Sequence, residues 1–249
     1  MAGTMPAPDL ARRSFTPELM DTEPVPFESF RDCLRELEWL TRWSMGYRPT
    51  LQWIARAARR LPPGSTLSVL DVGCGYGDML RRIARWGARA GVRLELTGVD
   101  LNPWSARAAR EATPPDYAIR YETSDIFDFA PDRHFHCIVS AIFTHHLDDA
   151  QLVAFLQWME RHATLGWFIS DLHRHAVPYW FLRALPAIVP LHRFVAHDGP
   201  VSVSRCLRAA EWRAAIAAAG IDAEHAVRIR WHVPFRWGIE RWQPGYATR

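Results

Sequence analysis

The amino-acid sequence predicts an α/β fold built on a doubly wound, mostly parallel β-sheet. From residue 65 onwards, short apolar runs alternate with helical stretches, which is the order of strands and helices in such a sheet. A glycine-rich turn, G-C-G-Y-G at residues 73–77, joins the first apolar run to the helical stretch that follows it. The chain has 249 residues, of which 49% are hydrophobic, so one large domain can bury a sizeable core.

The chain before this pattern divides into two parts. Residues 1–26 are rich in proline, alanine, threonine and acidic side chains, and we expect them to form a flexible tail. Residues 27–62 should form a helical N-terminal cap of two helices, the first with apolar residues at three- and four-residue steps. Gly46 ends the first helix, and Pro49 suits the first turn of the second.

The core is expected to occupy residues 63–249. Its strands are placed at residues 67–72, 94–99, 117–121, 135–141 and 167–170, with one or two more ending near Trp237. Its helices are placed at residues 79–88, 104–112, 152–162 and 208–219. The segment 173–204 interrupts this order as an apolar insertion after the fifth strand.

Composition excludes several kinds of protein. All 30 basic residues are arginine, so the chain has no lysine for Schiff-base chemistry or for a phosphate-binding P-loop. The net charge of +3 is small, and the arginine pairs at residues 12–13, 59–60 and 81–82 are expected on solvated surfaces, so we expect no nucleic-acid partner. The four cysteines stand far apart, and neither a metal site nor a disulfide framework is expected. No apolar stretch follows the first arginine pair, which favours a cytoplasmic location.

The glycine-rich turn indicates the kind of cofactor. Glycines allow a sharp turn and a close approach of a ligand to the backbone, and the following helix offers free N–H groups. The spacing is G-x-G-x-G, whereas a dinucleotide site, which is the alternative, uses G-x-G-x-x-G. Asp71 stands two residues before the first glycine, where a carboxylate repels a pyrophosphate and suits a cationic amine. Asp100 ends the second strand, where it can accept from ribose hydroxyls, and Asp125 and Ile126 follow the third, where they can meet an adenine.

Three motifs in this region resemble those of the class I S-adenosylmethionine-dependent methyltransferases. They are VLDVGCGYGD at residues 69–78, LTGVD at 96–100 and SDIFDF at 124–129. The resemblance covers roughly residues 65–220. It implies a Rossmann-like, seven-stranded methyltransferase fold that binds S-adenosyl-L-methionine and releases S-adenosyl-L-homocysteine.

The same resemblance assigns the cofactor to residues at the ends of the first four strands. They are Asp71, Gly73, Gly75, Asp100, Leu101, Asp125, Ile126, Ser140 and Ala141. The first three would hold the methionine part of the cofactor, and the next two would meet the ribose and the adenine. Asp125 would bond the adenine amino group and Ile126 would pack on its ring, while Ser140 and Ala141 would pass their backbone beside the sulfonium.

The residues after the fourth strand narrow the class of acceptor. Residues 141–148 read AIFTHHLD and lack the Pro-Pro-aromatic and Pro-Cys motifs of nucleic-acid methyltransferases. This stretch resembles the His-His-Leu sequence of a small-molecule branch that includes quinone-biosynthesis methyltransferases. The whole chain is also similar to methyltransferases of bacterial aromatic polyketide pathways.

The apolar insertion is expected to form a lid over the ligand crevice, and a hydrophobic dimer surface is the alternative. Its arginines and prolines argue against a membrane span. Tyr179 and Trp180 of the insertion, with Trp43 and Tyr47 of the cap, are candidate acceptor-binding residues.

Three histidines are candidate catalytic residues: His145, His146 and His173. A phenol has a pKa near ~10, so a histidine with a pKa near ~6.5 could remove its proton as the methyl group moves. Asp171 could orient His173 for this task. The alternatives are a structural hydrogen-bonding role for His146 and a polar loop start for His173.

The expected function is O-methylation of a phenolic, polyketide-like or quinone-like small molecule with S-adenosylmethionine. C-methylation of an electron-rich aromatic ring is the alternative within the enzymes. A non-catalytic, S-adenosylmethionine-binding partner subunit is the alternative of another class. We expect a small-molecule acceptor, no membrane span, and a monomer or homodimer.

Overall fold

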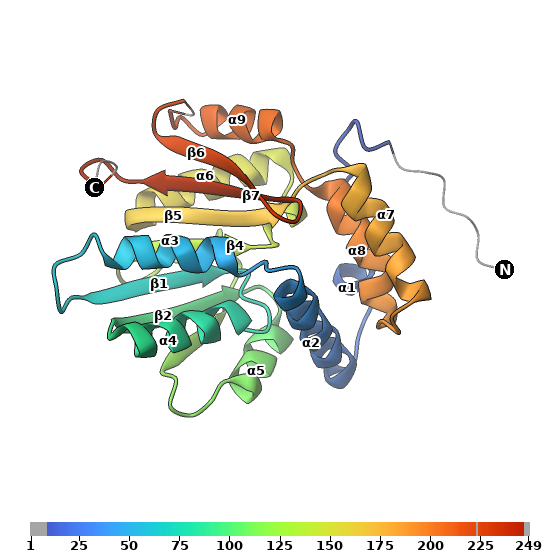
Figure 1. Cartoon of the computed structure of the whole chain (residues 1–249), viewed down its shortest axis with the longest axis horizontal. Coiled ribbons are helices and arrows are strands. Elements are labelled where there is room, and N and C mark those ends of the chain that lie inside the picture. Colours follow the sequence, from blue (N-terminus) through green and yellow to red (C-terminus); the bar gives the residue numbers. More distant parts are fainter. Residues whose placement is uncertain (1–8, 223, 247–249) are drawn as a thin grey trace.

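The computed structural model describes residues 9–222 and 224–246, and its centre is one seven-stranded sheet (Figure 1). The strands lie in the order β3-β2-β1-β4-β5-β7-β6. They are β1 (Thr66–Val72), β2 (Arg93–Asp100), β3 (Ile119–Thr123), β4 (Phe135–Ala141), β5 (Ala163–Leu172), β6 (Val227–His232) and β7 (Arg236–Trp242). Strands β1 to β5 run parallel to one another, and β7 is antiparallel to both β5 and β6. This arrangement confirms the predicted doubly wound, mostly parallel sheet.

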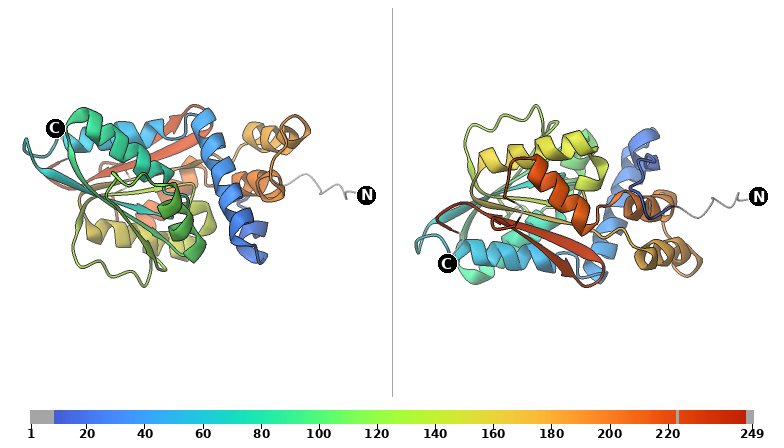
Figure 2. Two further views of the ribbon diagram at one scale, coloured as in Figure 1. Left: turned by 90° about the horizontal axis from the view of Figure 1, so that it is seen from below. Right: turned by 90° about the horizontal axis from the view of Figure 1, so that it is seen from above.

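Helices cover both faces of the sheet, as the two views of Figure 2 show. One face carries α3 (Arg48–Ala58), α4 (Asp78–Ala90) and α5 (Pro103–Ala112), which share a buried apolar cluster with β1 and β2. The other face carries α6 (Asp149–His162) and α9 (Ala209–Ala218). Because helices cover the central parallel strands on both faces, the side chains on both sides of these strands are apolar. The core strands are therefore continuous apolar runs in the sequence.

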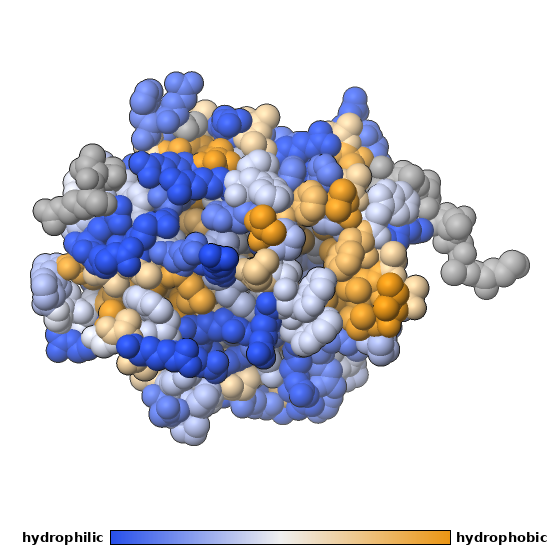
Figure 3. Space-filling view, in the orientation of Figure 1, coloured by the Kyte–Doolittle hydropathy of each residue, from blue (hydrophilic) through white to orange (hydrophobic). Residues whose placement is uncertain are grey.

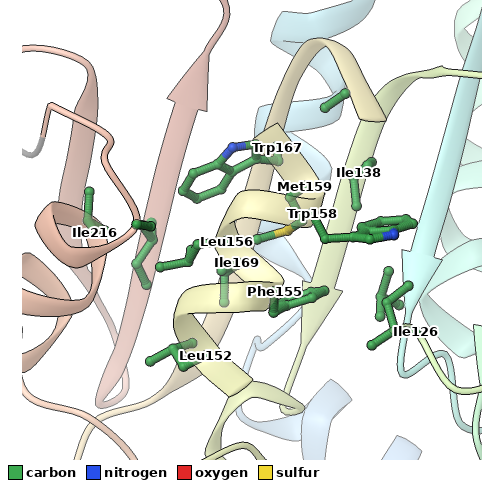
Figure 4. Close-up of a cluster of buried hydrophobic side chains, with 14 of the residues drawn as sticks. Ile126, Ile138, Leu152, Phe155, Leu156, Trp158, Met159, Trp167, Ile169 and Ile216 are labelled. Atoms are coloured by element: carbon green, nitrogen blue, oxygen red, sulfur yellow. The ribbon is translucent and has the colours of Figure 1, made fainter. Parts of the chain in front are cut away.

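The cluster under α6 shows how this packing arises. Trp167 and Ile169 of β5 point towards Phe155 and Met159 of α6, which are four residues apart and so lie on one face of the helix (Figure 4). The capping box formed by Asp148 and Gln151 fixes where that helix begins. Burial of such large side chains contributes about 1.5–3 kcal/mol each, so this layer anchors the sheet.

Further helices lie beyond the carboxyl ends of the parallel strands (Figures 1 and 2). They are α1 (Leu19–Thr22), α2 (Phe27–Trp43), α7 (Ala176–Ala184) and α8 (Arg193–Arg205), with the 3-10 turns η1 (Thr144–His146) and η2 (Leu185–Ala187). The expected insertion is thus helical, and α7 packs on α8, which in turn contacts α1 and α2. Ligands of open α/β sheets bind at this edge, so these helices surround the candidate site.

The boundaries of three strands differ clearly from the sequence-based expectation. The fifth strand, expected at residues 167–170, runs over Ala163–Leu172. The third strand runs over Ile119–Thr123 instead of residues 117–121, and the last strand continues to Trp242, beyond the expected end near Trp237. The end of β7 was not predicted as a strand because it contains charged residues. One of them, Glu240, is buried there because other side chains satisfy its carboxylate. Glu240 pairs with Arg56 of α3 and accepts a hydrogen bond from the indole of Trp242.

The first part of the chain differs more strongly from the expected tail. Residues 1–8 lie outside the described residues, but residues 9–26, here called the N-terminal segment, pack on the carboxyl edge of the sheet. Arg13 donates hydrogen bonds to the carbonyls of Leu147 (2.6 Å) and Arg205 (2.7 Å). The side chain of Arg13 is therefore largely buried, and so is that of Arg81 in α4. Both findings correct the expectation that the arginine pairs at residues 12–13 and 81–82 lie on solvated surfaces.

Apolar side chains also reach the surface at this end of the molecule. Figure 3 shows them gathered over α7, where Trp180, Phe181 and the neighbouring Ile188 are exposed. Within residues 9–222 and 224–246, none of the helices has both the length and the apolar character needed to cross a bilayer.

Candidate active site

The glycine-rich turn adopts the conformation that its sequence predicts. Gly73, Gly75 and Gly77 have φ values of 69°, 49° and 69°, which favour glycine because a β-carbon is strained there. A β-carbon at Gly73 would also lie 2.6 Å from the ring of Phe143, and one at Gly77 would collide with the Tyr121 hydroxyl. The turn is therefore held tightly between β1 and α4, with its backbone at the carboxyl edge of the sheet.

Three carboxylates, those of Asp71, Asp78 and Asp100, lie at this turn. Asp71 is only 2% exposed, and no hydrogen bond or ion pair from a described residue reaches its carboxylate. Burial, and then the charges of Asp78 and Asp100, raise the pKa of Asp71 well above its ordinary value. A bound cation would relieve this repulsion, whereas a pyrophosphate would increase it. The turn thus fits the cationic amine of S-adenosylmethionine better than a dinucleotide.

Asp100, the expected ribose-binding residue, is tied to the glycine-rich turn by hydrogen bonds from the backbone. Its carboxylate accepts hydrogen bonds from the backbone N–H groups of Gly75 (2.8 Å) and Asn102 (2.9 Å). Burial raises the pKa of Asp100, while these backbone bonds act in the opposite direction. Two N–H donors fix the carboxylate in one orientation beside the turn, which is the preorganisation that a ligand site needs.

The predicted adenine-binding residues lie close to Asp100 but differ in exposure. The backbone carbonyl of Asp100 accepts from the N–H of Ser124 (3.0 Å), which brings the loop after β3 to the end of β2. Leu101 is 70% exposed and Asp125 is half-buried, so both can meet a ligand. Ile126 is instead buried in the apolar cluster under α6, where most of its surface contacts the protein core.

The end of β4 adjoins the turn through the register of the sheet. Ser140 pairs with Val72, and its hydroxyl donates to the Val72 carbonyl (2.9 Å). Ala141 follows, and the chain then bends at Ile142, whose φ is +54°. This bend places η1, with its two histidines, directly after the strand end where the sequence predicted the reaction centre.

His145 lies buried between two carboxylates. Its Nδ1 is 3.0 Å from Oδ1 of Asp171, and its Nε2 is 3.5 Å from Oε1 of Glu18 in the N-terminal segment. The second oxygen of Asp171, Oδ2, accepts hydrogen bonds from the Thr144 hydroxyl and from the backbone N–H of His145. The sequence predicted Asp171 as a partner of His173, and this is wrong, since Asp171 orients His145 instead.

These contacts keep His145 protonated. Burial alone would lower its pKa, but the charge of Asp171 and the hydrogen bonds around it raise the pKa well above the ordinary value. Burial would likewise raise the pKa of Glu18, but the hydrogen bond and charge of His145 lower it to about 2. A protonated imidazole that faces two carboxylates has no lone pair for a substrate proton, so His145 is suited to a structural role.

His146 has a different environment. Its side chain is 30% exposed, and its Nδ1 lies 3.0 Å from Oδ2 of Asp21 in α1. Its Nε2 is 4.0 Å from Glu18, which is too far for a hydrogen bond. A charge on this ring would lower the pKa of Asp100, which burial raises, so His146 lies on the side of the glycine-rich turn.

His173 packs among aromatic rings at the turn between β6 and β7. Its ring lies edge-on to Trp237, with centroids 4.9 Å apart, and stacks on Phe235. Burial, and then the positive charges of His175 and Arg208, lower its pKa, so the ring is neutral. Its Nδ1 is buried and has no hydrogen-bond partner in the part of the chain that the structure describes.

The four candidate acceptor-binding residues occupy different environments. Trp43 is 63% exposed and stacks on Phe181 of α7, with ring centroids 6.0 Å apart, and Trp180 is also exposed. Tyr179 is buried within the packing of α7. Tyr47 is buried as well, and its hydroxyl donates to Asp78 at the start of α4. Tyr47 thus supports the end of the glycine-rich turn, at the start of α4.

Sequence reasoning missed the residues that hold η1 in place. Glu18 and Asp21 contact its two histidines, and Arg205 of α8 donates to the carbonyls of His145 (3.1 Å) and His146 (3.2 Å). These partners are far apart in the chain, and no local spacing links them to η1. They define the site only once the N-terminal segment and α8 have packed on the sheet edge.

Comparisons with known proteins agree with this geometry. Residues 69–166 match a family described as a methyltransferase domain. A stretch of 96 residues is 34% identical to 2-methyl-6-phytyl-1,4-hydroquinone methyltransferase of Synechocystis sp.. That match covers 38% of this chain and 28% of the relative, so the chain spans less than a third of the curated protein that it matches.

Solved structures of methyltransferases share the fold. The plantazolicin methyltransferase BpumL, in complex with a substrate analogue and S-adenosylhomocysteine, matches with a TM-score of 0.59 and 14% identity over 87% of this chain and 96% of that chain. Magnesium protoporphyrin IX methyltransferase from Synechocystis PCC 6803, also with bound S-adenosylhomocysteine, matches with a TM-score of 0.54 and 12% identity over 80% and 82%. These likenesses confirm the predicted Rossmann-like fold.

Proposed function

We propose that this chain is an S-adenosylmethionine-dependent methyltransferase that methylates a phenolic oxygen of an aromatic or lipophilic small molecule, since residues 69–166 match a methyltransferase domain. The observation that carries the proposal is the buried carboxylate of Asp71, which lacks a partner among the described residues beside a left-handed glycine turn. A buried carboxylate without a partner is costly, and a cationic amine at this place would offset that cost.

The residues of the turn would hold the cofactor. Asp71 would bind its amine, the backbone of Gly73 and Gly75 would lie along its methionine part, and Asp100 would accept from its ribose hydroxyls. Leu101 and Asp125 would meet the adenine, and Ile126 would contact it through the edge of its side chain that remains accessible. When bound, S-adenosylmethionine supplies an electrophilic methyl group on a sulfonium.

His146 would be the base that assists methyl transfer. Its Nδ1–H donates to Asp21, and this contact assigns the lone pair to Nε2, which has no hydrogen bond to the described residues. As the phenolic oxygen forms its bond to the methyl carbon and the carbon–sulfur bond breaks, the phenol proton would pass to Nε2. Such assistance is typically worth about 10²–10⁴-fold in rate. The neutral ring of His173 is the second candidate, and His145 would act only as a positioning residue.

The acceptor class rests on the apolar side chains at the carboxyl edge. Trp43, Phe181 and Trp180 present aromatic surface beside the helices that cover the site. Aromatic surface of this kind favours an aromatic or lipophilic acceptor over a sugar or a nucleotide. The curated relative, whose name describes a hydroquinone methyltransferase, supports the same class of acceptor.

The test is methyl transfer from S-adenosyl-[methyl-¹³C]methionine to a panel of phenols, hydroquinones and naphthols. The label should enter a methoxy group, whereas label on a ring carbon would favour C-methylation. His146→Ala should lower turnover at least about tenfold without weakening the binding of S-adenosylhomocysteine. His225→Ala, which changes an exposed histidine far from the site, is the control. Unchanged turnover in His146→Ala would exclude this base, and cofactor binding with no transfer to any acceptor would favour the non-catalytic subunit.

A further inference from the structure

Arg236 is a buried cation that forms no ion pair with another residue of the described chain. It is the first residue of β7, and its side chain is only 4% exposed. Its Nε and Nη1 have no hydrogen-bond partner within the described ranges, and Nη2 makes only a long contact of 3.5 Å with Ser44. The guanidinium lies under the loop between α2 and α3, where a β-carbon at Gly46 would come within 2.7 Å of Nη2.

Other buried donors on the same face of the sheet also lack partners. Arg236 pairs with Leu172 of β5, so Ser170, two residues earlier, points to the same face, which α3 covers. Trp53 of α3 stacks on Phe168, and Thr50 lies one helical turn nearer the carboxyl edge. The hydroxyls of Ser170 and Thr50 are buried and have no hydrogen-bond partner in the described chain.

A buried guanidinium of this kind is costly. Arginine stays charged at all ordinary pH values, and a buried charge without a partner destabilises a fold by several kcal/mol. Burial lowers the pKa of Arg236, and the negative charge of Asp171 offsets this only in part. Among the described residues, Asp171 pairs with His145 and not with Arg236, and its oxygens accept hydrogen bonds from Thr144 and His145. A charge that is retained at such a cost indicates a site for an anion.

The position of this site fits the acceptor. Arg236 is at the carboxyl edge of the sheet, where it pairs with Leu172 at the end of β5, and β4 ends on the other side of β5. Tyr47 follows Gly46, which packs on the guanidinium, and donates to Asp78 at the end of the glycine turn. Gly46 and Tyr47 thus connect this site to the glycine-rich turn.

We propose that Arg236 binds a carboxylate of the methyl acceptor, with Ser170 and Thr50 as additional donors, so that the acceptor is an aromatic acid. This inference rests on the proposed function, because it assigns a substrate class to the same site. Arginine is the side chain best suited to a carboxylate, and hydrogen bonds between charged groups are about twice as strong as neutral ones.

The test compares 4-hydroxybenzoate with 4-hydroxybenzamide, which has nearly the same shape but no charge. Each is titrated into the full chain saturated with S-adenosylhomocysteine, and binding is followed by calorimetry. The wild type should bind the acid at least tenfold more tightly than the amide. Absence of acid binding at millimolar concentration, or equal affinity for the two compounds, would overturn the inference, and this arm requires no variant.

Variants then test the residue itself. Arg236→Gln should reduce the preference for the acid to about onefold, Arg236→Lys should retain part of it, and Arg230→Gln, at an exposed arginine of the same hairpin, should retain all of it. S-adenosylhomocysteine should bind all of these proteins equally. Weaker binding of S-adenosylhomocysteine to Arg236→Gln would assign Arg236 to the carboxylate of the cofactor and overturn the inference. Failure of the wild type to bind S-adenosylhomocysteine would instead count against the proposed function.

Discussion

The imidazole of His145 lies 3.0 Å from the carboxylate of Asp171, and this pair joins the end of β4 to the end of β5. Glu18 approaches the other side of the ring at 3.5 Å, so the N-terminal segment is attached to the sheet through the same histidine. The neighbouring His146 is held by Asp21 from that segment. The candidate base is thus positioned by a buried ionic cluster and not by η1 alone.

Removing His145 should destabilise the fold strongly. His145→Ala leaves Asp171 and Glu18 as buried carboxylates without their shared cation, and breaking a buried pair typically costs about 3–5 kcal/mol. Urea denaturation of the two proteins measures this difference in the free energy of unfolding. The control is His225→Ala, because His225 pairs with Asp222 on an exposed surface and its loss should change little. Similar effects of the two substitutions would contradict the account.

The contribution of Glu18 to stability should depend on pH. Its pKa falls to about 2 in the folded chain, so its contribution is complete above its ordinary value of 4.5 and is lost as the pH falls towards about 2. His145 has a raised pKa, so its contribution is complete below 6.5 and is lost as the pH rises through the raised value. The cluster is therefore strongest between these two limits.

Glu18→Gln isolates the acidic limb of this dependence. The difference in unfolding free energy between wild type and variant should be about 3 kcal/mol near pH ~5.5 and should fall to about 1 kcal/mol or less near pH ~2.5. Urea midpoints at the two pH values provide the measurement. A difference that does not change with pH would show that the carboxylate of Glu18 is not held in its ionised form by the histidines.

Alanine in place of Gly77, in the glycine-rich turn, should destabilise the fold more than alanine in place of Gly91, which has no close neighbours. Gly77 and Gly91 have nearly the same backbone conformation, with φ of 69° and 66°, but only Gly77 has neighbours that a β-carbon would strike. Gly91→Ala should cost about 1–2 kcal/mol for the left-handed conformation alone, and Gly77→Ala about 1–3 kcal/mol more for the collision with Tyr121. Equal unfolding free energies for the two variants, measured in urea, would exclude this collision.

The sequence predicted the cofactor side of the site because its determinants are local. Asp71, Gly73 and Gly75 lie within five residues, and their conformation follows from one strand that turns into one helix. Asp100 could be added because parallel strands end at the same edge of a sheet. Each of these residues was found where its position in a strand or turn predicted.

The acceptor side could not be predicted in the same way. Glu18 and Asp21 lie more than a hundred residues from the histidines that they contact, and the composition around them indicated a tail. Arg236 follows a turn and resembles any surface arginine in the sequence, although packing buries it. Such residues acquire their roles from tertiary contacts, which no periodicity of the local sequence records.

The central claim is that a sulfonium nucleoside binds at the glycine turn beside Asp71 and Asp100, and calorimetric titration with S-adenosylhomocysteine tests it most directly. The wild type should bind S-adenosylhomocysteine and should show no binding of NADH at the same concentration. Asp100→Ala should weaken the binding by about 1.5–3 kcal/mol, while Asp128→Ala, at an exposed carboxylate nearby, should not. An absence of heat with the wild type, or an unchanged affinity of Asp100→Ala, would contradict the account.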